Sequence, residues 1–520
     1  MDTLSDTTWD VIINGTGLAQ SLLALALSRS GKKVLHIDSN RYYGGPDAAF
    51  SLDEAQEWAE EVNKDSTESC FRDASIFVPD SSASEASEGT TAAPQLASNR
   101  SYTLSLSPYF LHARSQLMSA LVSSKVFRQL EFMAVGSWWI YTPEQASSEN
   151  SALGAEKIFS RVPGNREDVF AATHISMKSK RTLMRLLRHV TQPKEEVDGD
   201  EDMSMPLKEY LTSKFSVPEE LHDPLLSLSL SQLSHQDTPA SYAVPRIQRH
   251  IASIGHLGPG FGAVIAKYGG GAEILQAACR ASAVGGGVYA LDTPIHDLLW
   301  RTTPEFSEHP FLAMLGKTGT VQAKFIFCPA SHDLSEQASG PAVDVSRSIN
   351  IVSATFPSLF PVTVEGAPVP ATAVLMFPGD TLGSPQSPPV YVQVHSSDTG
   401  ECPRHQSIIY CSVALPGPEG QSLLASAVDR LVQAEGSSAS VLWSLRYTHR
   451  GNLSNGETRH LTTEDDISNL YKFPVSSLDL AFEDDALELA KEAWKKVVGD
   501  EVDDDDFMKF DDRDGASDDS

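Results

Sequence analysis

The stretch Asp10–Asp38, DVIINGTGLAQSLLALALSRSGKKVLHID, decides the fold of the first part of this chain. The apolar run at residues 11–13 predicts a strand, the run at 21–30 predicts a helix, and residues 34–37 predict a second strand that ends on Asp38. A strand, a glycine turn, a helix, a strand and an acid are, in that order, typical of a βαβ dinucleotide-binding unit. The alternative, an unrelated tight turn, accounts less well for the two flanking strands.

The glycine turn departs from the dinucleotide fingerprint G-x-G-x-x-G at one position. Gly15 and Gly17 stand where one glycine makes the turn and the next lets a pyrophosphate approach. Gln20 stands where the third glycine would bring helix and strand close together. A long amide side chain there favours a retained fold over a retained nucleotide. We therefore expect a dinucleotide-type scaffold that keeps Asp38 at the acidic position and binds no cofactor.

The composition is that of a large, acidic globular protein. A chain of 520 residues with 41% hydrophobic content can bury more than one core, so we expect two or more domains. The net charge of −29 argues against nucleic acid as the main partner, because phosphate binding needs a cationic surface. In residues 500–520, eleven acids face only Lys509 and Arg513. Such a block predicts a solvated, disordered tail or, secondarily, a docking arm for a basic partner.

Cysteine spacing and apolar runs indicate the compartment. Five cysteines are scattered without C-x-x-C spacing, which suits a reducing compartment and predicts no zinc site. They are Cys70, Cys279, Cys328, Cys402 and Cys411. The N-terminus lacks the basic region of a signal peptide, and no apolar run reaches the roughly 18 residues of a membrane span. We expect a cytoplasmic protein without a metal site.

Shifts in composition divide the chain. Residues 62–99 are rich in Ser, Ala, Glu and Thr and predict a disordered insertion, because this composition buries little apolar surface. Helical spacing of apolar residues predicts a mainly helical domain at 116–234. Glycine turns and short strands follow it. We therefore expect a composite α/β domain of residues 1–115 and 235–499, interrupted by the helical domain and followed by the acidic tail.

Motifs for common chemistries are incomplete or missing. The tripeptide Gly316-Lys317-Thr318 is similar to the end of a phosphate loop, but Phe311 stands where that loop needs its first glycine. We interpret the tripeptide as a turn between strands. The sequence contains neither a G-x-S-x-G nucleophile elbow nor an H-E-x-x-H metal pair.

A second glycine-rich segment, residues 268–280 (YGGGAEILQAACR), has a stronger functional pattern. Three glycines lead into a predicted helix on which Glu273 and Arg280 lie seven residues apart, so both fall on one face. One interpretation is a solvated charged face of little energetic value. The other is a polar platform for another protein, to which Tyr43 would contribute if the sheet brings the two segments together.

Together these segments resemble the family of Rab GDP-dissociation inhibitors and Rab escort proteins. The motifs that carry the resemblance are residues 15–18 (GTGL), 31–38 (GKKVLHID), 42–45 (YYGG), 268–280 and 283–295 (AVGGGVYALDTPI). Weaker similarity covers residues 102–250 and 440–500. The resemblance implies an FAD/NAD-binding-like α/β domain with a smaller inserted all-helical domain. This family is not known for redox chemistry, in agreement with Gln20.

The resemblance also implies a Rab-binding platform made of Tyr43, Glu273 and Arg280. This sequence departs from the family motif Y-G-x-G-E, because Ala272 is inserted before Glu273. The segment 274–276 also lacks the usual proline. Glu273 therefore stands one position later than the family motif predicts.

The segment that begins at Arg161 is similar to the escort branch of the family. The escort pattern R-V-P-x-x-R-x-D-V-F, followed eleven residues later by arginine, places Phe170 and Arg181 at the positions that dock onto Rab geranylgeranyl transferase. The inhibitor branch has a smaller aliphatic residue at the first of these positions. An exposed Phe beside an Arg is a plausible interface anchor. The alternative is that Phe170 is part of the core of the helical domain.

The resemblance implies a non-catalytic escort protein. Such a protein binds newly made GDP-bound Rab, presents it to the transferase heterodimer, and shelters the geranylgeranyl lipid in its helical domain during transient membrane contact. One alternative is a Rab GDP-dissociation inhibitor that recycles prenylated Rab without recruiting the transferase. A less favoured alternative is a flavin-dependent oxidoreductase, which would be yellow when purified.

Overall fold

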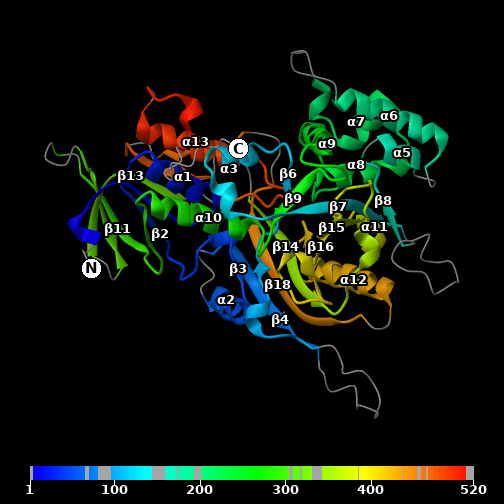
Figure 1. Ribbon diagram of the computed structural model, residues 1–520, viewed down its shortest axis with the longest axis horizontal. Coiled ribbons are helices and arrows are strands. Elements are labelled where there is room, and N and C mark those ends of the chain that lie inside the picture. Colours follow the sequence, from blue (N-terminus) through cyan, green and yellow to red (C-terminus); the bar gives the residue numbers. More distant parts are fainter. Residues whose placement is uncertain are drawn as a thin grey trace, which may run out of the picture.

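The computed structural model describes residues 4–64, 69–79, 95–142, 158–164, 166–171, 175–191, 201–301, 303, 308–316, 319–330, 342–383, 386–436, 439–453, 458–463, 467–499 and 501–510. Two large sheets and a group of helices make up this part of the chain. In Figure 1 the first sheet, with β11 at its edge, lies at the left and the helical group α5 to α9 lies at the upper right. The strands of the second sheet lie to the right of the first sheet and below the helical group.

The first sheet is built on the βαβ unit predicted at the start of the chain. It has eight strands in the order β10-β2-β1-β13-β12-β11, and β20 joins β13 with β19 beside it. The strands are β1 (Thr8–Asn14), β2 (Val34–Ile37), β10 (Val288–Ala290), β11 (Ile295–Trp300), β12 (Phe311–Leu315), β13 (Gly319–Pro329), β19 (Thr462–Thr463) and β20 (Leu470–Phe473). The first of these, β1, runs parallel to both β2 and β13. The predicted strands at 11–13 and 34–37 are confirmed.

Four helices and the sheet enclose one core. The helices are α1 (Leu18–Arg29), α3 (Gln116–Ser123), α10 (Gly271–Val284) and α13 (Asp485–Val498). The predicted helix at 21–30 is confirmed as α1, which begins three residues earlier. Helix α1 lies against both α10 and α13, so its residues 21–28 are buried all round. That surrounding explains why the sequence of α1 is apolar on every side.

The second sheet has ten strands in the order β4-β18-β14-β17-β16-β15-β7-β9-β6, with β8 beside β7. These strands are β4 (Phe71–Phe77), β6 (Leu111–His112), β7 (Phe132–Tyr141), β8 (Phe159–Arg161), β9 (Ala263–Ala266), β14 (Val343–Val352), β15 (Thr372–Phe377), β16 (Val390–Ser396), β17 (Ser407–Val413) and β18 (Val441–Gly451). The long helix α12 (Gly417–Glu435), preceded by the short α11 (Gly379–Leu382), packs on this sheet. Helix α2 (Leu52–Lys64) packs on it together with the small pair β3 (Ala49–Phe50) and β5 (Leu104–Ser105).

The helical group consists of five helices that share one core with strands β7, β9, β15 and β16 of the second sheet. The helices are α5 (Arg166–Ala171), α6 (Met177–Thr191), α7 (Leu207–Phe215), α8 (His222–Ser229) and α9 (Ala240–Ser253). The expected helical domain at 116–234 is therefore wrong at both ends. Strand β7 belongs to the second sheet and α3 belongs to the first core, whereas α9 extends the helical group past residue 234. A strand can pair with strands that are distant in sequence, and the spacing of apolar residues does not indicate which sheet it joins.

The prediction that residues 62–99 form a disordered insertion is wrong for part of that range. Residues 62–64 complete α2, and β4 pairs with β18 at the edge of the second sheet. The side chain of Phe71 is buried against Trp58 and Tyr447. Residues 65–68 and 80–94 lie outside the described part of the chain.

The predicted disordered tail is also wrong for residues 501–510, which we call the acidic–aromatic segment. Asp504 forms ion pairs with Lys491 and Lys495 of α13. The ring of Phe507 packs edge-on against Trp494, and Met508 is only 1% exposed. These contacts offset the like-charge repulsion from which the sequence predicted disorder. Residues 500 and 511–520 lie outside the described part.

Candidate functional site

The glycine turn of the βαβ unit is closed by its own side chains. Gly15 adopts a positive φ of 89°, as the turn requires. The amide of Gln20 folds back over the turn, so that a Cβ placed on Gly17 would lie 3.0 Å from its Oε1 atom. Gln20 therefore fills space beside the turn that a pyrophosphate would approach in a dinucleotide-binding protein.

A carboxylate of the chain occupies the N-terminus of α1, where a nucleotide phosphate would bind. The backbone N–H of Leu18 donates a hydrogen bond to Oδ2 of Asp47 at 3.3 Å. Helix N-termini attract anions because their N–H groups and the helix dipole point outward. Burial raises the pKa of Asp47 to about 6. The hydrogen bond from Leu18 and the positive charge of Arg347 both lower this pKa, but by less than burial raises it. Asp47 thus acts as an internal substitute for the phosphate.

The acid at the end of β2 is likewise engaged within the chain. The hydroxyl of Thr16 donates to Asp38 at 2.6 Å, and the backbone and side-chain nitrogens of Asn40 donate at 2.8 and 2.9 Å. Gly44 N–H donates to the Thr16 hydroxyl at 2.9 Å, which ties the following loop to the turn. The residues that would hold a dinucleotide therefore do not fit one, because their polar groups already bind one another.

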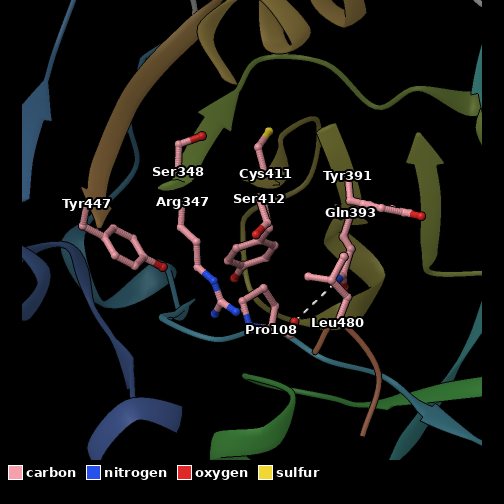
Figure 2. Close-up of a pocket in the computed structure, with 10 residues that line it drawn as sticks. Pro108, Arg347, Ser348, Tyr391, Gln393, Cys411, Ser412, Tyr447 and Leu480 are labelled. Carbon is pink, nitrogen blue, oxygen red and sulfur yellow. Dashed lines mark hydrogen bonds between the residues drawn. The ribbon is translucent and has the colours of Figure 1, made fainter. Parts of the chain in front are cut away.

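A cavity in the second sheet is too small for a cofactor or a lipid. It is lined by Pro108, Arg347, Ser348, Tyr391, Gln393, Tyr410, Cys411, Ser412, Tyr447 and Leu480, and Figure 2 shows nine of these side chains with labels. Its volume of about 10 Å³ corresponds to roughly one water molecule. The buried guanidinium of Arg347 donates to the carbonyls of Leu106 and Leu478, so this residue joins two loops to β14. We assign Arg347 a structural role.

Tyr43, the first predicted platform residue, lies between α1 and α10. Its hydroxyl is 2.8 Å from that of Ser21 on α1, and its ring packs edge-on against His36 and Tyr289. Burial raises the pKa of Tyr43, and the hydroxyl also contacts the thiol of Cys279 on α10. Since Cys279 directly precedes Arg280, the sheet does bring the Tyr43 loop to the helix that carries the other two predicted residues.

The glycine turn before α10 fixes where that helix begins. Gly269 and Gly270 have positive φ angles of 129° and 59°, which favour glycine. A Cβ on Gly271 would overlap the hydroxyl of Tyr109, so the first residue of α10 must lack a side chain. The extra Ala272 is accommodated within the first turn of α10.

Glu273 and Arg280 form an ion pair on one face of α10, as their spacing predicts. Nη2 of Arg280 lies 2.8 Å from Oε1 of Glu273, and the arginine side chain is 49% exposed. Nε of Arg280 donates to Oε1 of Gln129 at 3.2 Å. Gln129 ends the short helix η5 (Val126–Gln129), far from α10 in sequence. No sequence pattern pointed to Gln129, nor to Asp47 or Cys279.

Phe170 and Arg181, the residues predicted to contact the transferase, lie on adjacent helices. Phe170 is 58% exposed on α5, so the alternative that it belongs to the core is wrong; its neighbour Val169 is the buried residue. Arg181 is exposed on α6. Nζ of Lys180 donates to the carbonyl of Phe170 at 3.0 Å and links the two helices.

Local contacts hold α5 and α6 in place. Arg161 and Asp168 form an ion pair that anchors α5 to the end of β8. Ser176 accepts a hydrogen bond from the backbone N–H of Ser179 at 3.1 Å and so caps the start of α6. Across the described ranges we find no helix long and apolar enough to cross a bilayer, and no cluster of three or more His, Cys, Asp or Glu residues able to hold a metal ion.

The βαβ unit in its mixed sheet, the second sheet and the helical group α5 to α9 together form an FAD/NAD-binding-like α/β fold. A model of the family described as GDP dissociation inhibitor matches residues 5–78 and 84–421, and the chain belongs to this family. This match confirms the family and the fold class that the sequence predicts.

Relatives from both branches of the family match the chain. It is 28% identical over 429 residues to Rab proteins geranylgeranyltransferase component A of Saccharomyces cerevisiae, covering 82% of this chain and 64% of that protein. It is 25% identical over 361 residues to the Rab GDP-dissociation inhibitor of the same yeast, covering 68% of this chain and 70% of that protein. The chain thus spans a little under two thirds of the yeast component A.

Solved structures show the same fold. The Rab GDI of Plasmodium falciparum has a TM-score of 0.62 at 18% identity, covering 94% of this chain and 98% of that one. An oxidoreductase of Methanosarcina mazei has a TM-score of 0.54 at 15% identity, covering 92% and 98%. At these identities the likeness concerns the fold alone.

Proposed function

We propose that this chain is a Rab escort protein. It binds newly made GDP-bound Rab GTPases, presents them to the Rab geranylgeranyl transferase heterodimer, and carries the prenylated Rab to membranes. The observation that supports this proposal over an inhibitor is the exposed Phe170 on α5, tied by Lys180 to the helix that bears Arg181. The relative named as component A in yeast also matches more of this chain than the yeast inhibitor does.

In this proposal Rab binds at the platform of Tyr43, Glu273 and Arg280. The half-exposed guanidinium of Arg280 is the strongest hydrogen-bond donor of the three and suits a carbonyl or carboxylate of Rab. Its pairing with Glu273 holds the side chain extended across α10 and so lowers the ordering cost on binding. Tyr43 is packed between helices and supplies a rigid aromatic edge.

The transferase binds the outer surface of α5 and α6. Phe170 is the apolar anchor and Arg181 the charged one, a combination enriched among the energetically dominant residues of interfaces. The Phe170 side chain is 58% exposed, so a partner that covers it would remove apolar surface from water.

The helical group shelters the lipid after rearrangement. At about 0.8 kcal/mol per buried CH₂, a C20 chain represents on the order of 10 kcal/mol or more of apolar burial that water does not provide. The chain supplies no catalytic residue of its own; the transferase's own metal site performs the alkylation. In the proposal the protein is cytoplasmic, contacts membranes transiently, uses no cofactor and has no nucleic-acid partner.

Transferase binding by a Phe170→Ala variant tests the proposal. We expect the variant to lose at least about tenfold in affinity for the transferase, as a hot-spot residue does, and to keep its affinity for GDP-bound Rab. Phe77→Ala is a matched control, because Phe77 is 52% exposed at the end of β4, in the second sheet. Unchanged transferase binding by Phe170→Ala would leave the Rab GDP-dissociation inhibitor as the better assignment. Rab prenylation that does not require this protein would contradict escort function altogether.

A further inference from the structure

We propose that Gln129 is a positioning residue of the Rab-binding platform, a role that deepens the proposed function and rests on it. Two neighbours hold the guanidinium of Arg280: Glu273 accepts from Nη2 at 2.8 Å and Gln129 accepts from Nε at 3.2 Å. Two hydrogen bonds at different nitrogens fix both the position and the plane of a guanidinium, whereas a single ion pair leaves it free to rotate. Within the described residues no acceptor engages Nη1, so that nitrogen is available to Rab.

The backbone that carries Gln129 is itself well fixed. The turn before it is closed by hydrogen bonds from Arg128 N–H to the carbonyl of Lys125 at 3.3 Å and from Leu130 N–H to that of Phe127 at 3.1 Å. Val126 is buried in the first core. Gln129 therefore approaches α10 from an element that is anchored in the core that η5 and α10 share.

Gln129 also matters for charge. Its amide is neutral, so the group made of Glu273, Arg280 and Gln129 has one negative and one positive charge. A carboxylate in place of Gln129 would add a second negative charge beside the guanidinium. An amide oxygen orients Arg280 without adding to the negative charge of a protein whose net charge is already −29.

The test measures binding of a GDP-loaded Rab GTPase to four versions of the full chain. These are the wild type, Gln129→Met, Arg280→Ala and the double variant. Met matches the length of Gln and removes the acceptor. We expect Gln129→Met to weaken Rab binding by about three- to tenfold, in line with one charge-assisted hydrogen bond at a half-exposed site. In the Arg280→Ala background the same substitution should have no further effect, because its role is exerted through Arg280.

A matched control and a second readout keep the test decisive. Gln116→Met, at the exposed first residue of α3, makes the same chemical change away from Arg280 and should leave Rab affinity unaltered. In the free protein, exchange of the Arg280 Nε proton should be slow in the wild type and faster in Gln129→Met. The wild-type part of this measurement probes the hydrogen bond directly, so it remains decisive if Gln129→Met folds poorly and its affinity cannot be measured.

The outcomes separate the two levels of the argument. If Arg280→Ala binds Rab like the wild type, the platform itself is misplaced and the proposed Rab site fails. If Arg280→Ala weakens binding while Gln129→Met does not, or if the two effects simply add, Gln129 has no positioning role and the proposed function is untouched. A fast-exchanging Nε proton in the wild type would overturn the inference as well.

Discussion

Met508→Ala should undock the acidic–aromatic segment. Met508 is 1% exposed within the core shared by α1, α3 and α13. Removing a buried Met side chain usually costs about 2–5 kcal/mol. The loss is limited to the lower end of this range, because it cannot exceed the free energy that docks residues 501–510; beyond that point the segment detaches locally. We therefore expect a loss of about 2 kcal/mol, which corresponds to roughly a 30-fold change in the docking equilibrium.

Hydrogen exchange measures this local equilibrium without unfolding the whole protein. The Phe510 amide donates to the carbonyl of Ser123, and the Ser123 hydroxyl donates to the carbonyl of Met508 at 3.0 Å. Exchange of the amides at the end of the segment should accelerate by about 30-fold in Met508→Ala, since exchange follows local opening. Met177→Ala is the control, because Met177 is 64% exposed on α6. Wild-type amides that already exchange at the rate of an unstructured peptide would refute the docked segment.

Three further outcomes follow from the closed nucleotide site and the platform. Asp47 has a raised pKa in the folded state, so the stability that this residue contributes is lost as pH rises from about 4 to about 6. In urea denaturation, Asp47→Asn should therefore gain on the wild type by up to about 3 kcal/mol across that window. Gln20→Gly restores the glycine fingerprint but should not create flavin binding in a titration with FAD, because Asp47 and the Thr16–Asp38 bond remain; tight binding would contradict the closed site. Gly271→Ala should lower the melting temperature and also weaken Rab binding, because the new Cβ overlaps the Tyr109 hydroxyl and displaces the start of α10. A melting temperature equal to that of the wild type would show that the turn relaxes without cost.

The parts of the fold that sequence predicts are those set by local pattern. The βαβ unit was predicted correctly because its strands, turn and helix each carry their own signal within 29 residues. Strand β14 was missed because buried polar residues, among them Arg347 and Asn350, interrupt its apolar pattern. The carbonyls that accept their hydrogen bonds lie in loops and strands far away in the sequence, so the pattern of neighbouring residues does not indicate them.

The acidic–aromatic segment was mispredicted for the opposite reason. Its acids dominate the composition and conceal Phe507, Met508 and Phe510, whose partners on α1, α3 and α13 lie elsewhere in the sequence. Charge density is a good guide to disorder only when no apolar surface is available to accept the few apolar side chains present.

The candidate site likewise contains residues that the sequence predicts and residues that it does not. Spacing alone placed Glu273 and Arg280 on one face, with Tyr43 as a third member if the sheet brings it there. The resemblance added Phe170 and Arg181, and the binding roles of all five residues remain predictions. Gln129 reaches Arg280 across 151 positions, and no feature of its neighbourhood in sequence marks it. The internal phosphate substitute Asp47 was missed similarly, because its partner is a backbone N–H group that belongs to any helix.

The packing of α1 against α13 has a consequence for how the nascent chain folds. The indole N–H of Trp494 donates to the hydroxyl of Ser30 at 3.0 Å, across 464 positions of sequence. At about 5–20 residues per second, a ribosome needs on the order of half a minute or more to make the intervening chain. Throughout that interval the apolar flank of α1 lacks its partner. Chaperones that protect exposed helices during translation should therefore engage α1 and release it only when α13 has emerged.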